Sequence, residues 1–201
     1  MADTKFLKML EDECDSELCK LGFTRLRRGG VVWEFDSNFL GWIGLNTGNH
    51  GNTVRLNPFV GIHVVDIMKL SAAFSNKKYV KGGTATYAIH LGELVPKIPT
   101  FEFEVGADLN PEAKRLALAI YEHGLKYMAS LRNYEALGPF LYERMPLHGG
   151  YPERYILSLY CAGKIDQADK LASAIVEGES AWSEYSTPSI TEFCRAYLEH
   201  R

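Results

Sequence analysis

The sequence lacks the long apolar runs and the excess of one charge that would point to a membrane or to nucleic acid. Among its 201 residues no apolar run approaches the roughly 20 residues that a transmembrane helix needs. The first residues carry acids where a signal peptide needs an unbroken apolar core. The formal net charge of −3 gives no general attraction to nucleic acid or anionic lipid. We therefore expect a cytoplasmic protein that binds neither.

Cysteine is scarce, and its spacing excludes the usual cysteine frameworks. None of the four cysteines has CxxC spacing, which disfavours structural zinc. Cys14 and Cys19 lie five residues apart on a predicted helix, so they point about 140° apart and cannot easily form a disulfide. Cys161 and Cys194 fall in apolar helical contexts. We expect buried free thiols, which behave as small hydrophobes.

Catalytic motifs are missing as well. The six histidines show no HxxxH or HExxH spacing, and the chain has no GxSxG elbow. The glycine-containing stretches RRGG, TGNHGN and KGGTA match neither a phosphate-binding loop nor a dinucleotide fingerprint. The basic loop from Lys77 to Thr84 is more typical of a solvated surface than of an anion site. The sequence predicts no catalytic residue, no metal and no cofactor, and it disfavours an enzyme.

What the chain does contain is ordinary globular material, beginning with one amphipathic helix. Apolar residues make up 46% and charged residues 23%, values typical of a folded domain. Leucines and Cys14 recur at spacings of three and four over Thr4 to Leu21, which predicts a helix with one apolar face. Asp3 or Thr4 can cap its start, and Gly22 stands where a left-handed residue ends a helix.

Four strands are predicted to follow this helix as an antiparallel meander. The predicted strands are Phe23–Arg27, Val31–Asp36, Leu40–Asn46 and Thr53–Val64, and glycine-rich turns separate them. Alternation places Val31, Trp33 and Phe35 on the core face. Pro58 cannot donate to a ladder, which predicts that the fourth strand is an edge or is bulged there. Arg25 and Arg27 are expected to pair across strands with Glu34 and Asp36.

Later segments add strands first and then helices. Thr84–Leu91 and Thr100–Val105 are predicted strands, while Val65–Asn76 is a predicted short helix. The remaining helices are predicted at Asn110 to about Arg132, Tyr134–Met145 with a break at Gly138-Pro139, Pro152–Ala162, Asp166–Val176 and Thr187–Tyr197. The fold class is therefore α+β. We expect an N-terminal helix on an antiparallel meander of four to six strands over residues 1–108, then a bundle of four to five helices over 109–201, together one compact unit.

Two acidic clusters are the strongest surface signals. Between residues 11 and 17 five of seven are acidic, and a second acidic and aromatic stretch surrounds Trp182. Such clusters are often solvated, but they can also attract a basic protein partner. The candidate partner-binding residues are Glu11, Asp12, Glu13, Asp15, Glu17, Glu177, Glu179, Trp182 and Glu184.

The N-terminal third resembles a known kind of domain. The stretches FLKML, CKLGFTR, VVWEFDS, GLNTG and VRLNPFVGIH, between Phe6 and Val64, are similar to small bacterial immunity-type domains of unknown function found beside polymorphic toxins. The resemblance implies a cytosolic antidote that binds and blocks a toxin domain, for instance in contact-dependent growth inhibition. Many such toxins are basic nucleases, for which an acidic antidote is electrostatically suited. The partner implied is a cognate toxin protein.

Two other functions remain open. Polar and aromatic residues at Asn46, Asn57, His63, Tyr87 and His90 are consistent with a small-molecule-binding domain or enzyme whose site lies between the sheet and the C-terminal helices. The segment from Tyr155 to Val176 is similar to one tetratricopeptide hairpin, which would suit a helical adaptor. No second copy follows at a period near 34 residues, so an isolated hairpin is favoured over a repeat array.

Overall fold

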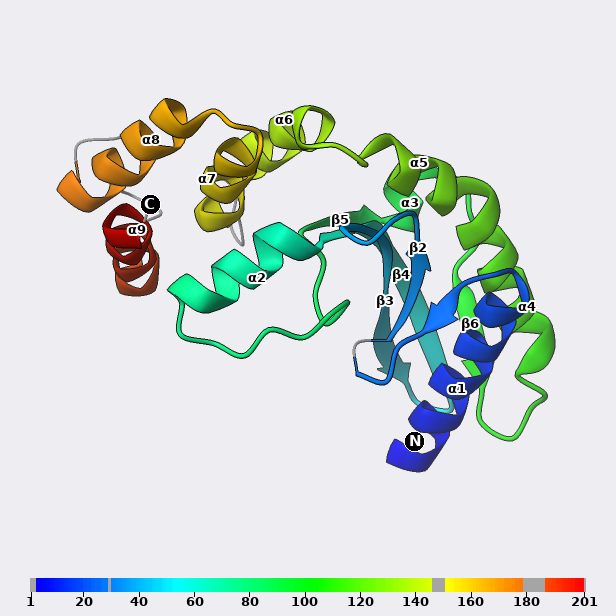
Figure 1. Ribbon diagram of the computed structural model, residues 1–201. Coiled ribbons are helices and arrows are strands. Elements are labelled where there is room, and N and C mark those ends of the chain that lie inside the picture. Colours follow the sequence, from blue (N-terminus) through cyan, green and yellow to red (C-terminus); the bar gives the residue numbers. More distant parts are fainter. Residues whose placement is uncertain (1–2, 29, 146–150, 179–186, 201) are drawn as a thin grey trace. The chain divides into compact units, whose positions relative to one another are not determined.

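The computed structural model describes residues 3–28, 30–145, 151–178 and 187–200. It confirms the predicted α+β class (Figure 1). The strands are β1 (Thr24–Arg25), β2 (Val31–Glu34), β3 (Phe39–His50), β4 (Thr53–Val64), β5 (Tyr87–His90) and β6 (Phe101–Glu104). The helices are α1 (Thr4–Lys20), α2 (Val65–Phe74), α3 (Leu91–Leu94), α4 (Asn110–Ala119), the π-helix η1 (Ile120–Gly124), α5 (Leu125–Ser130), α6 (Tyr134–Arg144), α7 (Pro152–Cys161), α8 (Ile165–Glu177) and α9 (Pro188–His200).

The chain clusters into two compact units. The first comprises residues 1–63 and 80–130, and the second comprises residues 64–79 and 131–201. The sequence changes from strand-rich to helix-rich near residue 108, between β6 and α4, yet α4, η1 and α5 cluster with the sheet. Conversely, α2 belongs to the helical unit although it follows β4 directly. Among the helices of the described ranges, none is both long and apolar enough to cross a membrane.

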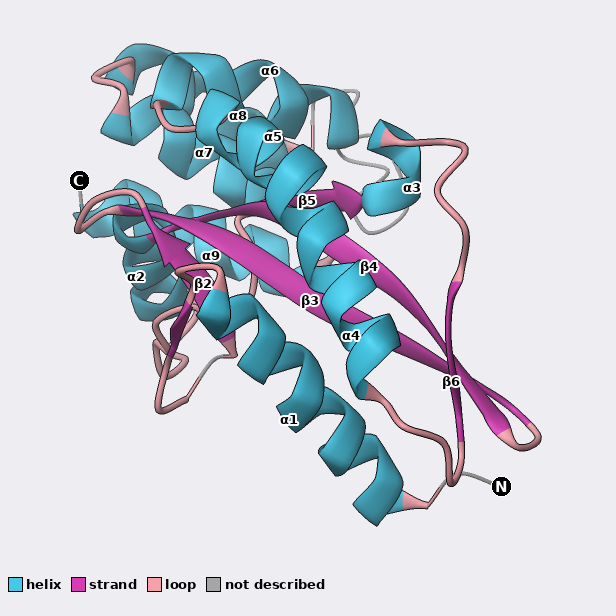
Figure 2. Cartoon of the chain, turned by 90° about the vertical axis from the view of Figure 1, so that its right-hand side faces the viewer, coloured by secondary structure: helices cyan, strands magenta, loops and turns pink. Residues whose placement is uncertain are grey.

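The first unit is a two-layer structure. Its six strands are ordered β1-β2-β3-β4-β5, with β6 also paired to β4. Helices α1 and α4 pack against each other on one face of this sheet (Figure 2). The core between the layers includes Leu10, Cys14 and Leu18 of α1, Val54 and Leu56 of β4, and Leu116 of α4, each no more than 1% exposed. The predicted apolar face of α1 is therefore the one that it buries.

The predicted ends of α1 are confirmed in atomic detail. Of the two candidate caps, Asp3 acts: its carboxylate accepts a hydrogen bond from the Phe6 amide at 2.8 Å. At the other end Gly22 has φ +102°, and its amide donates to the Cys19 carbonyl while the Phe23 amide donates to that of Leu18. This pair of bonds is the Schellman arrangement, which needs a residue with positive φ at the position of Gly22.

The edge position, one of the two alternatives predicted for β4, is wrong, because the strand lies inside the sheet. It neighbours β3 and also pairs with two other strands, β6 along Thr53–Leu56 and β5 along Phe59–Ile62. Asn57 and Pro58 fall in the interval between these two pairings. A proline without an amide hydrogen is tolerated there because neither strand needs its donor.

Two predicted helices also differ. The long helix predicted from Asn110 to about Arg132 contains the π-helical turn η1, where Gly124 lies so close to β4 that a Cβ atom would be 2.8 Å from Val60 Cγ1. A break was predicted in helix α6 at Gly138-Pro139, but the helix continues through Pro139 to Arg144. A proline in a helix removes only the one bond to the carbonyl four residues earlier, so packing can retain the helix around it.

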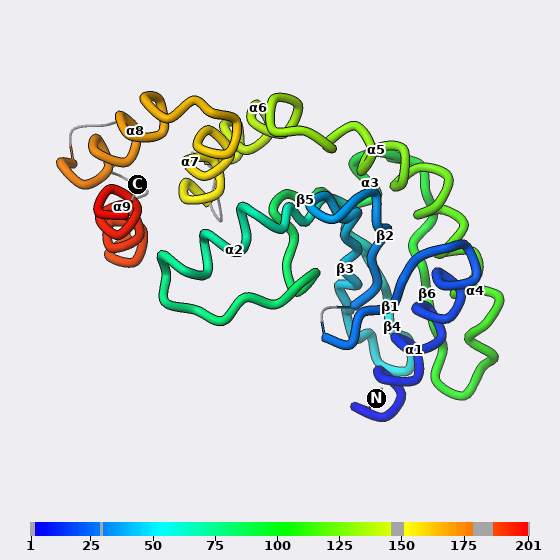
Figure 3. The backbone as a smooth tube through the Cα atoms, in the orientation of Figure 1, coloured from blue at the N-terminus to red at the C-terminus, as the bar shows by residue number. Residues whose placement is uncertain are grey.

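The second unit is built around α7. This helix packs against α2, α6, α8 and α9, and α9 also packs against α2 and α8 (Figure 3). The α7–α8 hairpin turns at Gly163, whose φ of +75° allows the amides of Gly163 and Lys164 to bond back to α7. Fully buried side chains such as Ile67, Ile156, Leu157 and Ala172 form its interior.

Candidate functional site

The predicted acidic cluster on α1 does not occupy a single face. Successive helix residues are turned by about 100°, so a run of acids surrounds the axis. Glu11 is exposed, Asp12 and Glu13 are half-buried, and Asp15 and Glu17 are only 6% exposed. The structure therefore separates these five residues into different environments.

Arg25 of β1 brings two of the acids together. It forms ion pairs with Asp12 and Asp15, the second through Nε at 3.3 Å. The hydrogen bond from Arg25 lowers the pKa of the Asp12 carboxyl. Burial outweighs the same attraction at Asp15 and raises its pKa to about 6. This pairing replaces the predicted cross-strand pairing of Arg25 with Glu34 and Asp36.

Those two acids of β2 and its following turn have other partners. Glu34 forms an ion pair with Lys81 at 2.9 Å, and Asp36 accepts hydrogen bonds from the Asn38 and Phe39 amides at 2.8 Å each. The aspartate therefore shapes the turn into β3. The lysine belongs to the loop that was predicted to be merely solvated, and the ion pair ties that loop to the sheet.

Asn110, the first residue of α4, joins two further acids of α1. Its side-chain amide donates to Glu13 at 2.7 Å and to Glu17 at 2.8 Å. Glu17 also accepts a hydrogen bond from Lys20, which is the main reason that the pKa of its carboxyl is lowered. These bonds hold the carboxylates of α1 in fixed positions between the two helices.

One exposed surface on α1 combines an apolar side chain with two of these carboxylates. Met9, Asp12, Glu13 and Ser16 stand at i, i+3, i+4 and i+7, so they form one strip along the helix, called here the Met9 strip. Met9 is 53% exposed. The Asp12 side chain is 44% exposed even though it is paired with Arg25. The Met9 strip is an apolar contact point flanked by negative charges that are already positioned.

The second predicted patch is described only in part. Glu177 is exposed at the end of α8, which Gly178 terminates with φ +70°. Glu179, Trp182 and Glu184 lie outside the residues that the structure describes.

His63 is buried rather than available to a ligand. Its Nδ1 lies 2.6 Å from the Thr84 carbonyl, to which it donates, and its Nε2 accepts from the Gly82 amide at 3.3 Å. The Trp42 indole donates to the Gly82 carbonyl at 3.0 Å. These bonds attach the loop that precedes β5 to the sheet, so His63 serves the fold.

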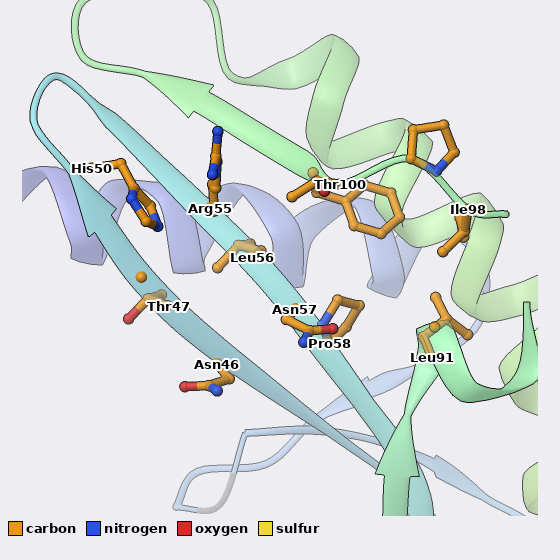
Figure 4. A pocket seen from close by; sticks show the side chains of 14 residues that line it. Asn46, Thr47, His50, Arg55, Leu56, Asn57, Pro58, Leu91, Ile98 and Thr100 are labelled. Carbon is orange, nitrogen blue, oxygen red and sulfur yellow. The ribbon is translucent and has the colours of Figure 1, made fainter. Parts of the chain in front are cut away.

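A cavity of about 380 Å³ opens where β5 and β6 leave β4 unpaired (Figure 4). Asn46 and Asn57 line it, as do His50 and Arg55 toward the β3–β4 turn and Leu91 and Ile98 at the opposite end. Arg55 is held by Glu102 at 2.8 Å. Of the five residues proposed from the sequence for a small-molecule site, only the two asparagines line this cavity.

The cysteines match the prediction only in part. Cys14 and Cys194 are buried, whereas Cys161 is half-buried and Cys19 is exposed. All four are free thiols. Burial raises the pKa to about 12 for Cys14 and Cys194 and to about 11 for Cys161, so these three thiols are protonated at neutral pH. Within the described part of the chain, no three His, Cys, Asp or Glu side chains are grouped to hold a metal ion.

Comparison with protein-family models, with curated proteins and with solved structures gives no match for this chain. The candidate sites therefore rest on geometry. Sequence reasoning missed the Met9 strip, although its i, i+3, i+4, i+7 spacing was readable once the helix was predicted. It also missed the sheet cavity, for which Asn57-Pro58 inside a strand was the available signal.

Proposed function

We propose that this protein binds a cognate bacterial toxin domain and neutralises it by stoichiometric docking. The resemblance of Phe6–Val64 to immunity-type domains motivates the proposal, and the Met9 strip is the observation that supports it. Methionine is enriched at protein interfaces, and its flexible side chain adapts to a partner's surface. The Glu13 carboxylate is held by the neutral Asn110 amide rather than by a cation, so it loses little further freedom on binding and offers its charge to a basic partner.

The test is co-expression of the chain with the toxin domain encoded by the adjacent gene. We expect rescue of growth and a one-to-one complex on gel filtration. If co-expression gives no rescue of growth and gel filtration shows no complex, the proposal is refuted. The side chains of Met9 and Ser16 form no hydrogen bond or ion pair with the described residues, so Met9→Ser and Ser16→Arg alter the surface and leave Arg25 and Asn110 in place.

A matched control distinguishes an effect of the Met9 strip from an effect of the net charge of α1. Ser16→Arg and Glu11→Gln each raise the net charge of α1 by one, but Glu11 projects from another side of the helix. We expect Ser16→Arg to weaken toxin binding about tenfold or more, since bulk and like charge oppose docking, while Glu11→Gln binds as the wild type does. Equal affinities for both variants would place the toxin elsewhere on the chain.

A second candidate function is small-molecule binding in the sheet cavity. Its volume of about 380 Å³ falls within the range of ligand sites, and Asn46 and Asn57 supply amide donors and acceptors beside apolar Leu91 and Ile98. A thermal-shift screen of polar metabolites would test it. We expect a stabilising ligand whose effect disappears in Asn57→Leu but persists in Asn52→Leu, a change at an exposed asparagine that does not line the cavity. The absence of any stabilising ligand would count against this function.

A further inference from the structure

Helix α7 forms the floor of a groove whose walls are α6 and α8, all within the second unit. Two hollows of about 340 and 360 Å³ follow each other along it. They share Tyr142 of α6, Tyr155 and Leu159 of α7, and Gln167 of α8. Because four residues line both hollows, the hollows adjoin and form one shallow open groove, called here the α7 groove.

The α7 groove has an apolar end and a polar end. Met145, Leu171 and Ala174 line the first, where Tyr142 is 48% exposed and its ring lies 5.4 Å from that of Tyr155. Ser158 and Lys164 line the second, together with the Glu135 carboxylate. An apolar side chain and a polar or charged one can therefore be bound along a single groove.

The α8 wall of the groove carries two lysines. Lys164 and Lys170 are exposed, and neither ammonium group forms an ion pair within the described ranges of the chain. A lysine side chain has no acceptor, so Lys164 at the N-cap of α8 gives no side-chain acceptor to the first amides of that helix. With a single carboxylate, that of Glu135, among the described lining residues, the groove favours a negatively charged ligand.

The groove also offers partners for a peptide backbone. Pro139 of α6 has no amide hydrogen, so it cannot donate to the Glu135 carbonyl four residues earlier, and both residues line the groove. The Gln167 side chain supplies a donor and an acceptor on the facing wall. An extended chain needs such partners for its own amides and carbonyls, whereas a helix satisfies them internally.

The dimensions fit a short extended segment. From Lys164 to Ala174 the α8 wall is about 15 Å long, which corresponds to roughly five residues of extended chain. Lys164 and Lys170 are about 9 Å apart along the axis. Two carboxylates at that distance lie two or three residues apart in an extended peptide.

We propose that the α7 groove binds an extended acidic peptide segment of a partner protein. Its carboxylates face Lys164 and Lys170, and a large apolar side chain occupies the space between Tyr142 and Leu171. This site lies in the second unit, and the Met9 strip lies in the first. The groove is therefore a separate binding activity with the opposite charge preference, independent of the toxin.

Selection of peptides on the full-length protein tests this inference. A phage-displayed library of random ten-residue peptides is selected on the wild type and on the double variant Lys164→Glu/Lys170→Glu. The matched control is Lys5→Glu/Lys126→Glu, which reverses two exposed lysines of the first unit. Selected peptides are then titrated by fluorescence anisotropy, with circular dichroism to verify that each variant is folded.

We expect wild type and control to enrich the same peptides, with two acidic residues two or three positions apart and one large apolar residue. The groove variant should bind them at least about tenfold more weakly. Tyr142→Ala should also weaken binding of these peptides, because it removes apolar contact without changing the charge of the groove. Enrichment without acids, enrichment of amphipathic helical sequences, no enrichment, or equal affinity in the groove variant would each overturn the inference. None of these results bears on toxin rescue.

Discussion

His63 illustrates at the residue scale how one side chain attaches a loop to a sheet. It is fully buried on β4, and its two ring nitrogens contact the Gly82 amide and the Thr84 carbonyl. This pattern requires the tautomer with hydrogen on Nδ1, since Nε2 must accept. Gly82 is itself buried, so its amide has little access to water once the imidazole is removed.

Replacing His63 by leucine should therefore destabilise the protein. The Gly82 amide would be left buried without an acceptor, and we expect the free energy of unfolding to fall by about 1 to 3 kcal/mol. Urea unfolding measures this value. His50→Leu is the matched control, since His50 is exposed beside the β3–β4 turn and should change stability by no more than about 0.5 kcal/mol. Similar losses in both variants would show that the His63 bonds contribute little.

Asp15 gives α1 a dependence on pH. Burial raises the pKa of its carboxyl to about 6 in the folded protein, from 3.8 as the ordinary value. The folded state therefore holds a proton that the unfolded state releases between these values. Stability from this residue is fully present below about pH 4 and is lost as the pH rises through about 6.

Asp15→Asn should remove that dependence. Across this pH range, we expect the wild type to lose on the order of 2 to 3 kcal/mol of unfolding free energy from this residue, and the variant should lack this component. The measurement is urea unfolding at pH 4, 5, 6 and 7. Glu122→Gln, at an exposed carboxylate that is not among the charges acting on Asp15, should retain the wild-type profile. If the pH profiles of Asp15→Asn and wild type coincide, the buried carboxyl does not cause the pH dependence of the unfolding free energy.

At the scale of elements, local patterns predicted the regular segments well. The bounds of β4 were predicted without error, and α1 was predicted to within one residue, because capping and turn residues mark their ends. Strand β3 continues to His50, beyond the predicted Asn46, because the β3–β4 ladder extends through a polar segment. The interior position of β4 was not predictable from Pro58, since two strands distant in sequence share its edge.

Gly61 shows how closely β4 and β5 approach each other. A Cβ atom at this position would lie 2.0 Å from the Tyr87 carbonyl oxygen and 2.6 Å from the Ala88 Cα atom. Gly61→Ala must therefore displace backbone, and we expect a loss of about 1 to 3 kcal/mol in unfolding free energy. Gly92→Ala in α3 is the control, because a Cβ atom there meets nothing within 4 Å. Chemical denaturation of both variants measures the unfolding free energies. An unchanged value for Gly61→Ala would contradict the close approach of β4 and β5.

At the scale of the whole molecule, a cluster in the sequence need not be a surface. The acids from Glu11 to Glu17 are contiguous along the chain, yet Arg25 and Asn110 engage four of the five. Those two partners are 10 or more positions away from the acids they bind. A single sequence does not reveal which distant residues meet. The α7 groove likewise depends on the packing of three helices, of which the sequence predicted only the α7–α8 hairpin as a pair.

The second unit is built from two separate segments of the chain, which leads to a prediction about fragments. Helix α2 comes from the middle of the chain, but it packs against α7 and α9, and the Phe74 ring lies 5.7 Å from that of Phe193 and 6.0 Å from that of Tyr197. A fragment of residues 131–201 lacks these contacts and exposes the apolar faces that α2 covers. We expect it to show weak helical circular dichroism without a cooperative thermal transition.

Adding a synthetic peptide of residues 64–79 should restore the missing layer. We expect helical signal and a cooperative transition to appear with saturation near one peptide per fragment, because the burial of Ile67 and the ring contacts of Phe74 link folding to binding. A peptide with Ile67→Ala and Phe74→Ala has the same length and charge and should be ineffective. A fragment that folds cooperatively alone would show that α2 is dispensable to this unit, and equal action of both peptides would show that its apolar face is not what the fragment lacks.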